Sequence, residues 1–161
     1  MHGSLALTSP AFENNGMIPA KYTCDGNRTL SPPLSISGVP EGTKSLVLIM
    51  DDPDIPKAIQ KAHGITVFDH WVLYNIPADT REIPESSSIG TAGLNGAGRG
   101  GYTGPCPPPQ YEPREHRYIF TLYTLSGTLQ YDETPTKQQV LDALTPMLLG
   151  KAELIGRYSR K

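Results

Sequence analysis

Two aspartates and two histidines stand at the ends of apolar segments of the chain. Asp52 and Asp54 follow one apolar run, His70 opens a second, and His116 directly precedes a third. A carboxylate that accepts a hydrogen bond from one imidazole nitrogen fixes the tautomer of the ring and leaves the other nitrogen for a ligand. The negative charge also raises the pKa of the histidine. The sequence therefore predicts a cationic imidazole cluster suited to phosphate or carboxylate.

A glycine-rich segment could complete such an anion site. Residues 101–104 read Gly-Tyr-Thr-Gly, and their backbone N–H groups are expected to supply further donors. The longer run 90–104 is not followed by the Gly-Lys-Ser/Thr of nucleotide-binding loops, and it forms either a cradle or a mobile rim. Aspartate and histidine are also metal ligands by type. Pairing between them would use the same lone pairs, so we expect no metal and no cofactor.

Three apolar runs must bring these residues together. Residues 45–50 form a short apolar run bounded by turn residues, which is typical of a strand buried on both faces, and residues 70–76 and 117–125 form a second strand and a third, longest one. If the first two runs are antiparallel neighbours, the end of one lies beside the start of the next. His116 joins the cluster if its strand runs parallel to that of His70, one place over in the sheet.

The remaining elements are short. Residues 4–8 and 34–37 alternate like strands, the first at a sheet edge, and 152–158 can return as a last strand. Residues 57–63 allow one helical turn. Residues 86–116 form a long loop, and such a loop inside a compact domain is usually functional or mobile.

Only one segment predicts a longer helix. Thr136 is a suitable N-cap, apolar residues recur at helical spacing from Val140 onward, and Gly150 is a suitable helix stop. Pro146 lies inside the pattern and predicts a kink or an early end. Because strands and helices do not alternate, we expect a single all-β domain over residues 1–161, with one accessory helix near the C-terminus.

The composition limits the function classes. A formal net charge of −2 over 161 residues gives no electrostatic case for nucleic acid or an anionic membrane surface, so anion binding must be local. No apolar run reaches the roughly 20 residues of a transmembrane helix, and residues 1–7 lack the pattern of a signal peptide. We therefore expect a cytoplasmic protein in which Cys24 and Cys106 are free thiols, while a disulfide between them stays an open alternative.

Four segments, in this order, resemble the signature of the phosphatidylethanolamine-binding (Raf-kinase-inhibitor-like) protein family. They read Asp52-Pro53-Asp54-Ile55-Pro56, His70-Trp71, Gly104-Pro105-Cys106-Pro107-Pro108 and His116-Arg117-Tyr118. Further segments resemble the bacterial and archaeal branch: Tyr22-Thr23-Cys24-Asp25-Gly26, Ser31-Pro32-Pro33-Leu34, Gly42-Thr43-Lys44-Ser45 and Asn75-Ile76-Pro77-Ala78. The resemblance covers essentially the whole chain, and four motifs in order make it specific.

This resemblance implies a large antiparallel sheet packed on a smaller one, and a small pocket that binds phosphate or phosphoryl head groups. Carried over residue by residue, the ligand-binding residues are Asp52, Asp54, His70, Gly104, Pro105, His116 and Tyr118. Ile55 stands where alanine is common and is expected to narrow the mouth. The chain ends soon after Tyr158, so the C-terminal helix of animal members is expected to be missing. Prokaryotic relatives also imply a homodimer.

Three functions fit these residues. The first is a non-enzymatic protein that binds a small anion or phospholipid head group and could modulate a protein partner. The second is an inhibitor of serine proteases or kinases, with residues 86–115 as the contact. The third is a hydrolase with His70 or His116 as general base, but no Gly-x-Ser-x-Gly nucleophile motif is present, so we expect no enzyme. Of the other histidines, His63 is expected in solvent and His2 in a disordered end.

Overall fold

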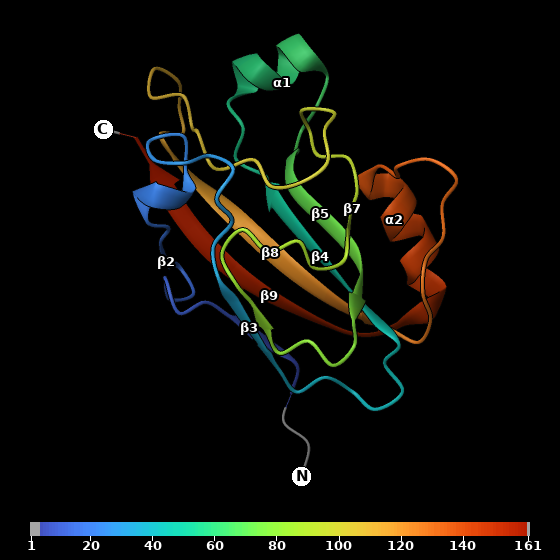
Figure 1. Ribbon diagram of the computed structural model, residues 1–161. Coiled ribbons are helices and arrows are strands. Elements are labelled where there is room, and N and C mark those ends of the chain that lie inside the picture. Colours follow the sequence, from blue (N-terminus) through green and yellow to red (C-terminus); the bar gives the residue numbers. More distant parts are fainter. Residues whose placement is uncertain (1–3, 161) are drawn as a thin grey trace.

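Two β-sheets pack against each other in the structure, a computed structural model that describes residues 4–160 (Figure 1). The small sheet has the strand order β1-β3-β6, and the large sheet has the order β2-β9-β8-β4-β5-β7. The bounds of the strands are β1 Ala6–Thr8, β2 Gly16–Met17, β3 Leu34–Ser37, β4 Ser45–Asp52, β5 Phe68–Pro77, β6 Glu82–Ile83, β7 Thr91–Ala92, β8 Glu115–Leu125 and β9 Leu148–Ser159. Neighbouring strands are antiparallel except β2 and β9. The predicted all-β class, with a large sheet on a smaller one, is confirmed.

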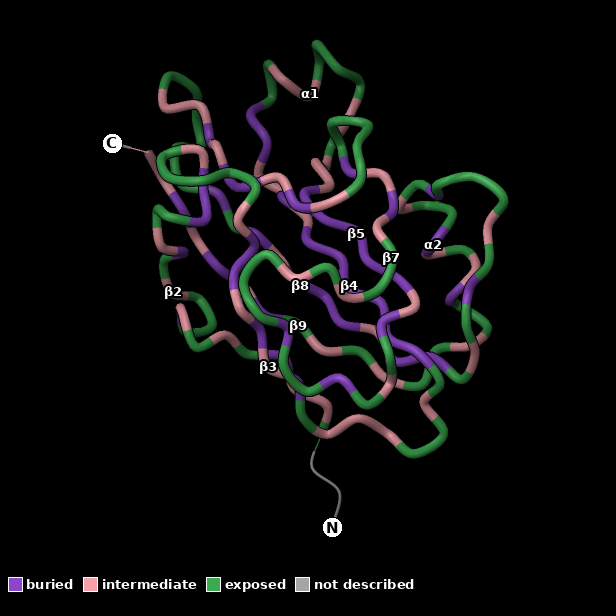
Figure 2. The backbone as a smooth tube through the Cα atoms, in the orientation of Figure 1, coloured by how far each residue is buried: buried purple, intermediate pink, exposed green. Residues whose placement is uncertain are grey.

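The three predicted apolar runs form the centre of the large sheet as β4, β5 and β8. β4 lies between β5 and β8 and runs antiparallel to both. Residues 45–50 of β4 are all buried, because both faces of this strand meet a hydrophobic core. Figure 2 shows buried backbone along these strands, while exposed segments concentrate in the surrounding loops.

Each face of the large sheet has its own core. Since successive side chains of a strand point to opposite faces, β4 contributes Leu46, Leu48 and Met50 to the core shared with the small sheet. It contributes Val47 and Ile49 to the second core. The helix α2 (Lys137–Leu144) covers that second face and buries its own apolar side chains there.

The helix near the C-terminus begins where the sequence predicts and ends early. The Thr136 side chain accepts a hydrogen bond from the N–H of Gln139 at 3.2 Å, and the Gln139 side chain accepts one from the N–H of Thr136 at 2.9 Å. This capping box fixes the start of α2. A 3₁₀ turn that contains Pro146 follows, because proline cannot continue the hydrogen-bond ladder of an α-helix. Gly150 as a helix stop is therefore wrong, since Leu148 already starts β9.

The smaller elements agree with the predicted pattern. Residues 57–63 form a short helix, α1 (Lys57–His63), which ends at Gly64 in the left-handed conformation with φ of 67°. Single 3₁₀ turns span Ala20–Tyr22 and Thr145–Met147. Among residues 4–160, none of the helices has both the length and the apolar character needed to cross a bilayer. His63 is exposed as predicted, whereas His2 lies outside the described residues.

Candidate functional site

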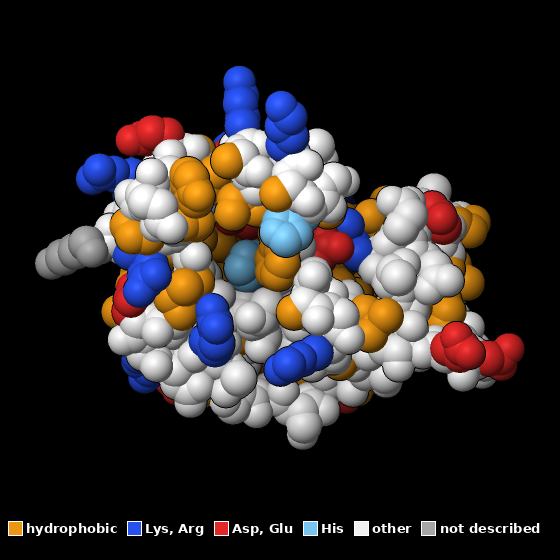
Figure 3. Space-filling model, turned by 90° about the horizontal axis from the view of Figure 1, so that it is seen from above, with side chains coloured by type: hydrophobic (Ala, Val, Ile, Leu, Met, Phe, Trp, Pro, Cys, Tyr) orange, Lys and Arg blue, Asp and Glu red, His pale blue; other side chains and the backbone are white. Residues whose placement is uncertain are grey.

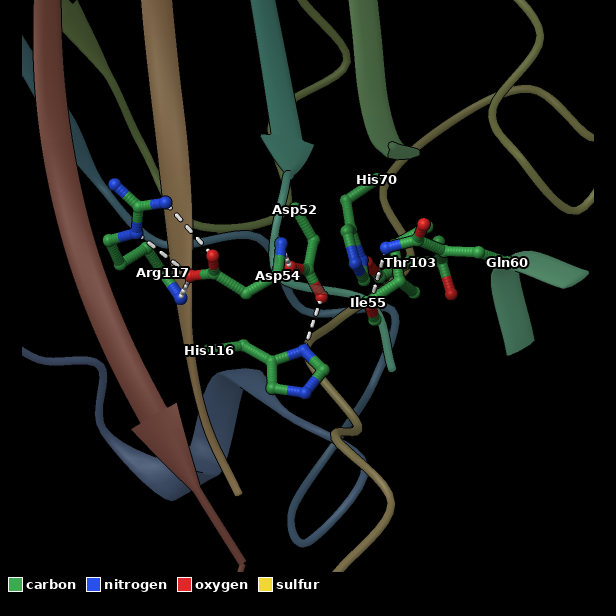
Figure 4. Close-up of polar contacts among 8 residues, drawn as sticks. All are labelled: Asp52, Asp54, Ile55, Gln60, His70, Thr103, His116 and Arg117. Carbon is green, nitrogen blue, oxygen red and sulfur yellow. Dashed lines mark hydrogen bonds and ion pairs between the residues drawn. The ribbon is translucent and has the colours of Figure 1, made fainter. Parts of the chain in front are cut away.

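The predicted convergence of strand ends is confirmed. Because β4 is antiparallel to both neighbours, its C-terminal end lies between the N-terminal ends of β5 and β8. Asp52 from β4, His70 from β5 and His116 from β8 therefore meet at one edge of the large sheet (Figure 4). These three residues are buried, with exposed fractions of 3%, 6% and 1%.

The converging side chains line a cavity of about 230 Å³. Figure 3 looks into this hollow from above and shows hydrophobic side chains around a histidine that lies below the surface. The lining residues are Arg28, Asp52, Ile55, Pro56, Ile59, Phe68, His70, Thr103, Gly104, Cys106, Pro107, Pro108, His116 and Tyr118. The cavity thus combines a few buried polar groups with a largely apolar wall, as ligand sites commonly do.

Asp52 orients His116. Asp52 Oδ2 accepts a hydrogen bond from Nδ1 of His116 at 2.6 Å, and Asp52 Oδ1 accepts one from the backbone N–H of Asp54 at 2.7 Å. The carboxylate keeps a ring proton on Nδ1, so Nε2 is the nitrogen left for a ligand. Within residues 4–160, Nε2 of His116 and the hydroxyl of Tyr118 are buried without a hydrogen-bond partner. Such atoms are rare in folded proteins, and here both belong to the cavity lining.

A β-bulge aims His70 at the cavity. Met50 pairs with Trp71 and Asp51 pairs with Asp69, so β5 carries one extra residue, His70, between the two pairs. Regular alternation would send His70 to the face opposite Trp71. The bulge instead keeps His70 on the face of Trp71 and turns Asp69 to the α2 face.

His70 is held in place and kept neutral by its surroundings. Nδ1 of His70 lies 2.7 Å from the carbonyl oxygen of Thr103, and the N–H of Thr103 donates to the carbonyl of His70 at 3.0 Å. The rings of Phe68 and Tyr118 pack edge-on against the imidazole, with centroids at 4.8 Å and 5.2 Å. Burial lowers the pKa of His70 below its usual value, although the Thr103 carbonyl and Asp52 oppose this effect. The expected cationic imidazole is therefore wrong for His70.

Of the glycine-rich segment 101–104, Thr103 and Gly104 line the cavity, and their expected backbone donors are occupied. The N–H of Thr103 donates to His70, and the N–H of Gly104 donates to the carbonyl of Arg28 at 2.7 Å. Gly104 is required for another reason, because a side chain there would collide with the backbone carbonyl of Tyr22. Thr103 and Gly104 thus shape the cavity wall and do not offer their N–H groups to a ligand.

Two of the predicted ligand-binding residues lie outside the lining. The Asp54 carboxylate accepts hydrogen bonds from Nε and Nη2 of Arg117 at 2.8 Å and 2.9 Å, and from the backbone N–H of Arg117 at 2.8 Å. These hydrogen bonds hold the pKa of Asp54 below its usual value. Pro105 accepts a hydrogen bond from the N–H of Cys24 at 3.1 Å. Both residues therefore fix the chain around the cavity, while Asp52, His70, Gly104, His116 and Tyr118 line it.

Cys24 and Cys106 form a disulfide, so the expectation of free thiols is wrong. Their Cα atoms lie 5.3 Å apart, and 82 residues separate them in the sequence. The bond ties the turn after Tyr22 to the cavity wall, because Cys106 is a lining residue. Disulfides persist mainly in oxidising compartments, and a cytoplasmic location stays a prediction.

Sequence reasoning missed Arg28 and much of the apolar wall. Phe68 belongs to the start of β5, before the predicted run 70–76, and Ile59 belongs to α1, for which the sequence predicted only a helical turn. Arg28 follows the segment Tyr22–Gly26, so that motif was the available signal for it. These residues reach the cavity because loops that are distant in the sequence lie over the ends of the strands.

Comparisons with known proteins agree with this architecture. A family model described as phosphatidylethanolamine-binding protein matches residues 8–159. A UPF0098 protein of Methanothermobacter thermautotrophicus is 42% identical over 161 residues, covering 96% of this chain and 98% of the relative. A crystal structure of a phosphatidylethanolamine-binding protein homologue from Chlamydia trachomatis has a TM-score of 0.89 and 40% identity, and the match covers 98% and 99% of the two chains. Escherichia coli YbcL, described as a new member of the mammalian family, has a TM-score of 0.83 and 26% identity, with 99% and 100% covered.

Proposed function

Because the chain belongs to the phosphatidylethanolamine-binding protein family, we propose that its cavity binds a small oxyanion such as phosphate or the phosphoryl group of a lipid head group. One observation carries this proposal. Nε2 of His116 and the hydroxyl of Tyr118 are buried in the lining without a partner in the described residues. Leaving a polar atom buried and unpaired costs about 1–3 kcal/mol, so a ligand that pairs with both atoms is favoured.

Size and charge support a small ligand. A cavity of about 230 Å³ suits a compact group, and its apolar wall could contact the substituent that such a group carries. Arg28, an exposed residue at the lining, adds a positive charge from outside. It can attract an anion without the protein as a whole being basic.

We propose binding without turnover. Asp52 orients His116 as the acid of a catalytic triad orients its histidine, which is the observation that favours a hydrolase. A triad also needs a nucleophile next to Nε2. Cys106, the cysteine of the described lining, has no free thiol because it forms the disulfide, so it cannot act as that nucleophile.

An NMR titration with inorganic phosphate and with phosphoethanolamine tests the binding. Millimolar ligand is expected to shift the signals of His70, Thr103 and Tyr118, and His116→Ala is expected to weaken binding at least about tenfold. His63→Ala is the matched control, because His63 is an exposed histidine on α1 and should leave the titration unchanged. Absence of shifts with both ligands would rule out the proposed function.

Inhibition of a serine protease or kinase is the second candidate. The segment 86–115 exposes Tyr111, with 41% of its area accessible, beside a groove formed with Pro56 and other residues at the start of α1. An exposed aromatic next to a groove is typical of a protein contact. Assays against a panel of serine proteases and kinases test this candidate, and Tyr111→Ser should abolish any inhibition found. The homodimer implied by prokaryotic relatives likewise stays a prediction.

A further inference from the structure

The hydrogen bonds around the two histidines determine which ring nitrogens carry protons. The carbonyl oxygen of Thr103 can only accept, so Nδ1 of His70 must hold the proton, and Nε2 of the neutral ring is a lone pair. The carboxylate of Asp52 imposes the same tautomer on His116. In their neutral forms both rings therefore offer the ligand an acceptor, where an anion needs a donor.

Few hydrogen-bond donors remain in the lining to offset these two acceptor nitrogens. The hydroxyl of Tyr118 is buried without a partner in the described residues, and the centroid of its ring lies 5.2 Å from that of His70 and 6.3 Å from that of His116. The N–H groups of Thr103 and Gly104 are already bonded to backbone carbonyls. Asp52 adds a buried negative charge. At the two histidines, an anion without a proton therefore meets two lone pairs and a carboxylate, which repel it, whereas the exposed Arg28 attracts any anion whether or not it carries a proton.

We propose that the cavity prefers an oxyanion that carries its own hydroxyl proton, as inorganic phosphate does near neutral pH, over an oxyanion of equal charge without one, such as sulfate. This inference rests on the proposed function and names the ligand class of the same site. The hydroxyl of the anion donates to Nε2 of His116 or His70, and Tyr118 donates its own hydroxyl to another oxygen of the anion. The proton of the ligand thus supplies what the neutral rings lack.

The preference depends on pH because the ring of His70 can gain a proton. Besides each other, the two rings have these titratable or charged groups nearby: Asp52 at the end of β4, Asp54 just after it, Tyr118 of β8 and Arg28 at the wall, with Asp69 of β5 on the opposite face of the sheet. Burial lowers the pKa of His70, so this ring stays neutral at neutral pH. As the pH falls, a protonated ring becomes a donor, and sulfate should then bind with uptake of a proton from the buffer.

Calorimetric titration of the full chain with phosphate and with sulfate tests this selectivity. At about pH 8, phosphate is expected to bind at least tenfold more tightly than sulfate, and because the pKa of His70 lies below its usual value the ratio is expected to narrow only at lower pH, for example at about pH 5. Titrations of sulfate in two buffers of different ionisation enthalpy should show net proton uptake. Equal affinities at the higher pH would overturn the inference while leaving oxyanion binding intact. Failure of phosphate, sulfate and phosphoethanolamine to bind at either pH would overturn the proposed function instead.

Asp52→Asn sharpens the test because it should reverse the tautomer of His116. The oxygen of the introduced amide can still accept from the N–H of Asp54, while its NH₂ group donates to Nδ1 of His116 and moves the ring proton to Nε2. The ratio of phosphate to sulfate affinity at about pH 8 is then expected to fall to within about threefold. Asp54→Asn removes the same charge outside the lining and should keep the wild-type ratio. If Asp52→Asn does not fold, NMR assignment of the wild-type tautomers decides, and a proton on Nε2 of either neutral ring would contradict the inference.

Discussion

Adjacent aspartates of β4 face opposite sides of the large sheet, and their surroundings differ. Asp52 faces the cavity and binds His116, whose Nε2 is left unpaired within the described residues. Asp51 faces α2, where Asp69 lies in register with it on β5. Lys137, from the first turn of α2, lies 2.8 Å from Asp69 and 3.5 Å from Asp51. On the α2 face, Lys137 therefore offsets part of the charge of the two carboxylates, and Asp69 Oδ1 has this ion pair although it makes no hydrogen bond, while Nε2 of His116 and the hydroxyl of Tyr118 on the cavity face have neither in the described residues.

The pKa values of buried groups on the two faces of the large sheet are also shifted in different directions. Burial raises the pKa of Asp51 to about 6, while Lys137 opposes this effect and Asp69 adds to it. Burial acts on His70 in the opposite sense and lowers its pKa. Both shifts favour the neutral form of a buried group. On the α2 face an ion pair limits the effect, whereas on the cavity face no permanent cation does so among the buried lining residues.

The largest expected effect concerns the covalent link, which is present only on the cavity side. Replacing both cysteines with Cys24→Ser and Cys106→Ser should lower the free energy of unfolding by about 2–5 kcal/mol, because the bond closes a long loop. Urea denaturation of the oxidised protein, the reduced protein and the double variant measures this. Identical transition midpoints for the oxidised and reduced proteins would show that the bond does not form or does not matter.

The next largest loss of stability is expected when the buried pair of Asp52 and His116 is broken. His116→Ala leaves the Asp52 carboxylate buried with one of its two hydrogen bonds, which is expected to cost about 2–4 kcal/mol. Urea denaturation beside the exposed control His63→Ala measures the difference. A loss no larger than that of the control would mean that the pair contributes nothing to stability.

Lys137→Met tests the face of the large sheet that α2 covers. Without the lysine the carboxylates of Asp51 and Asp69 repel each other, and we expect a loss of about 1–2 kcal/mol near neutral pH. The folded-state pKa of Asp51 already lies above its usual 3.8, at about 6, so the folded protein binds more protons than the unfolded one between these values. The destabilising contribution of Asp51 is therefore present above about pH 6 and disappears as the pH falls.

The variant should enlarge this dependence, since Lys137 lowers the pKa of Asp51. Denaturation curves of Lys137→Met and the wild type at several pH values between about 4 and 7 provide the measurement. A stability difference that does not change with pH would contradict the assignment of the effect to Asp51.

The smallest effect is expected for Arg117→Ala. The side chain of Arg117 is 54% exposed, so its ion pair with Asp54 should contribute less than about 1 kcal/mol. Since Asp54 lies outside the lining, phosphate affinity should stay within about twofold of the wild type. A large loss of affinity would instead indicate that Asp54 is part of the binding site, as the sequence predicted.

The strand ends and their convergence could be predicted because they follow from short-range patterns. Apolar runs closed by Asp-Pro or opened by histidine identify β4, β5 and β8, and antiparallel neighbours bring such ends together. The face on which His70 lies could not be predicted, because a one-residue bulge reverses the regular alternation. In the helical segment, Pro146 was compatible with either a kink or an early end of the helix. The helix ends early because the residues that follow pair with β8 as β9.

The chemistry of the site depended on packing that no local pattern contains. A carboxylate neighbour predicts a raised histidine pKa, but burial beside Phe68 and Tyr118 outweighs it at His70. Backbone N–H groups of the glycine-rich segment were predicted as donors, yet Thr103 and Gly104 use theirs to hold the loop. Whether two cysteines 82 residues apart meet is likewise a property of the whole fold.

The bond between Cys24 and Cys106 closes a ring of backbone that contains β3 to β7. A single proteolytic cut inside this ring, for example at the exposed Glu85, leaves one covalently connected molecule. The strand that carries His70 then stays attached to the strand that carries His116, and only a reductant separates the fragments. Oxidised protein cut in this way should keep His70 and His116 in one covalently connected molecule.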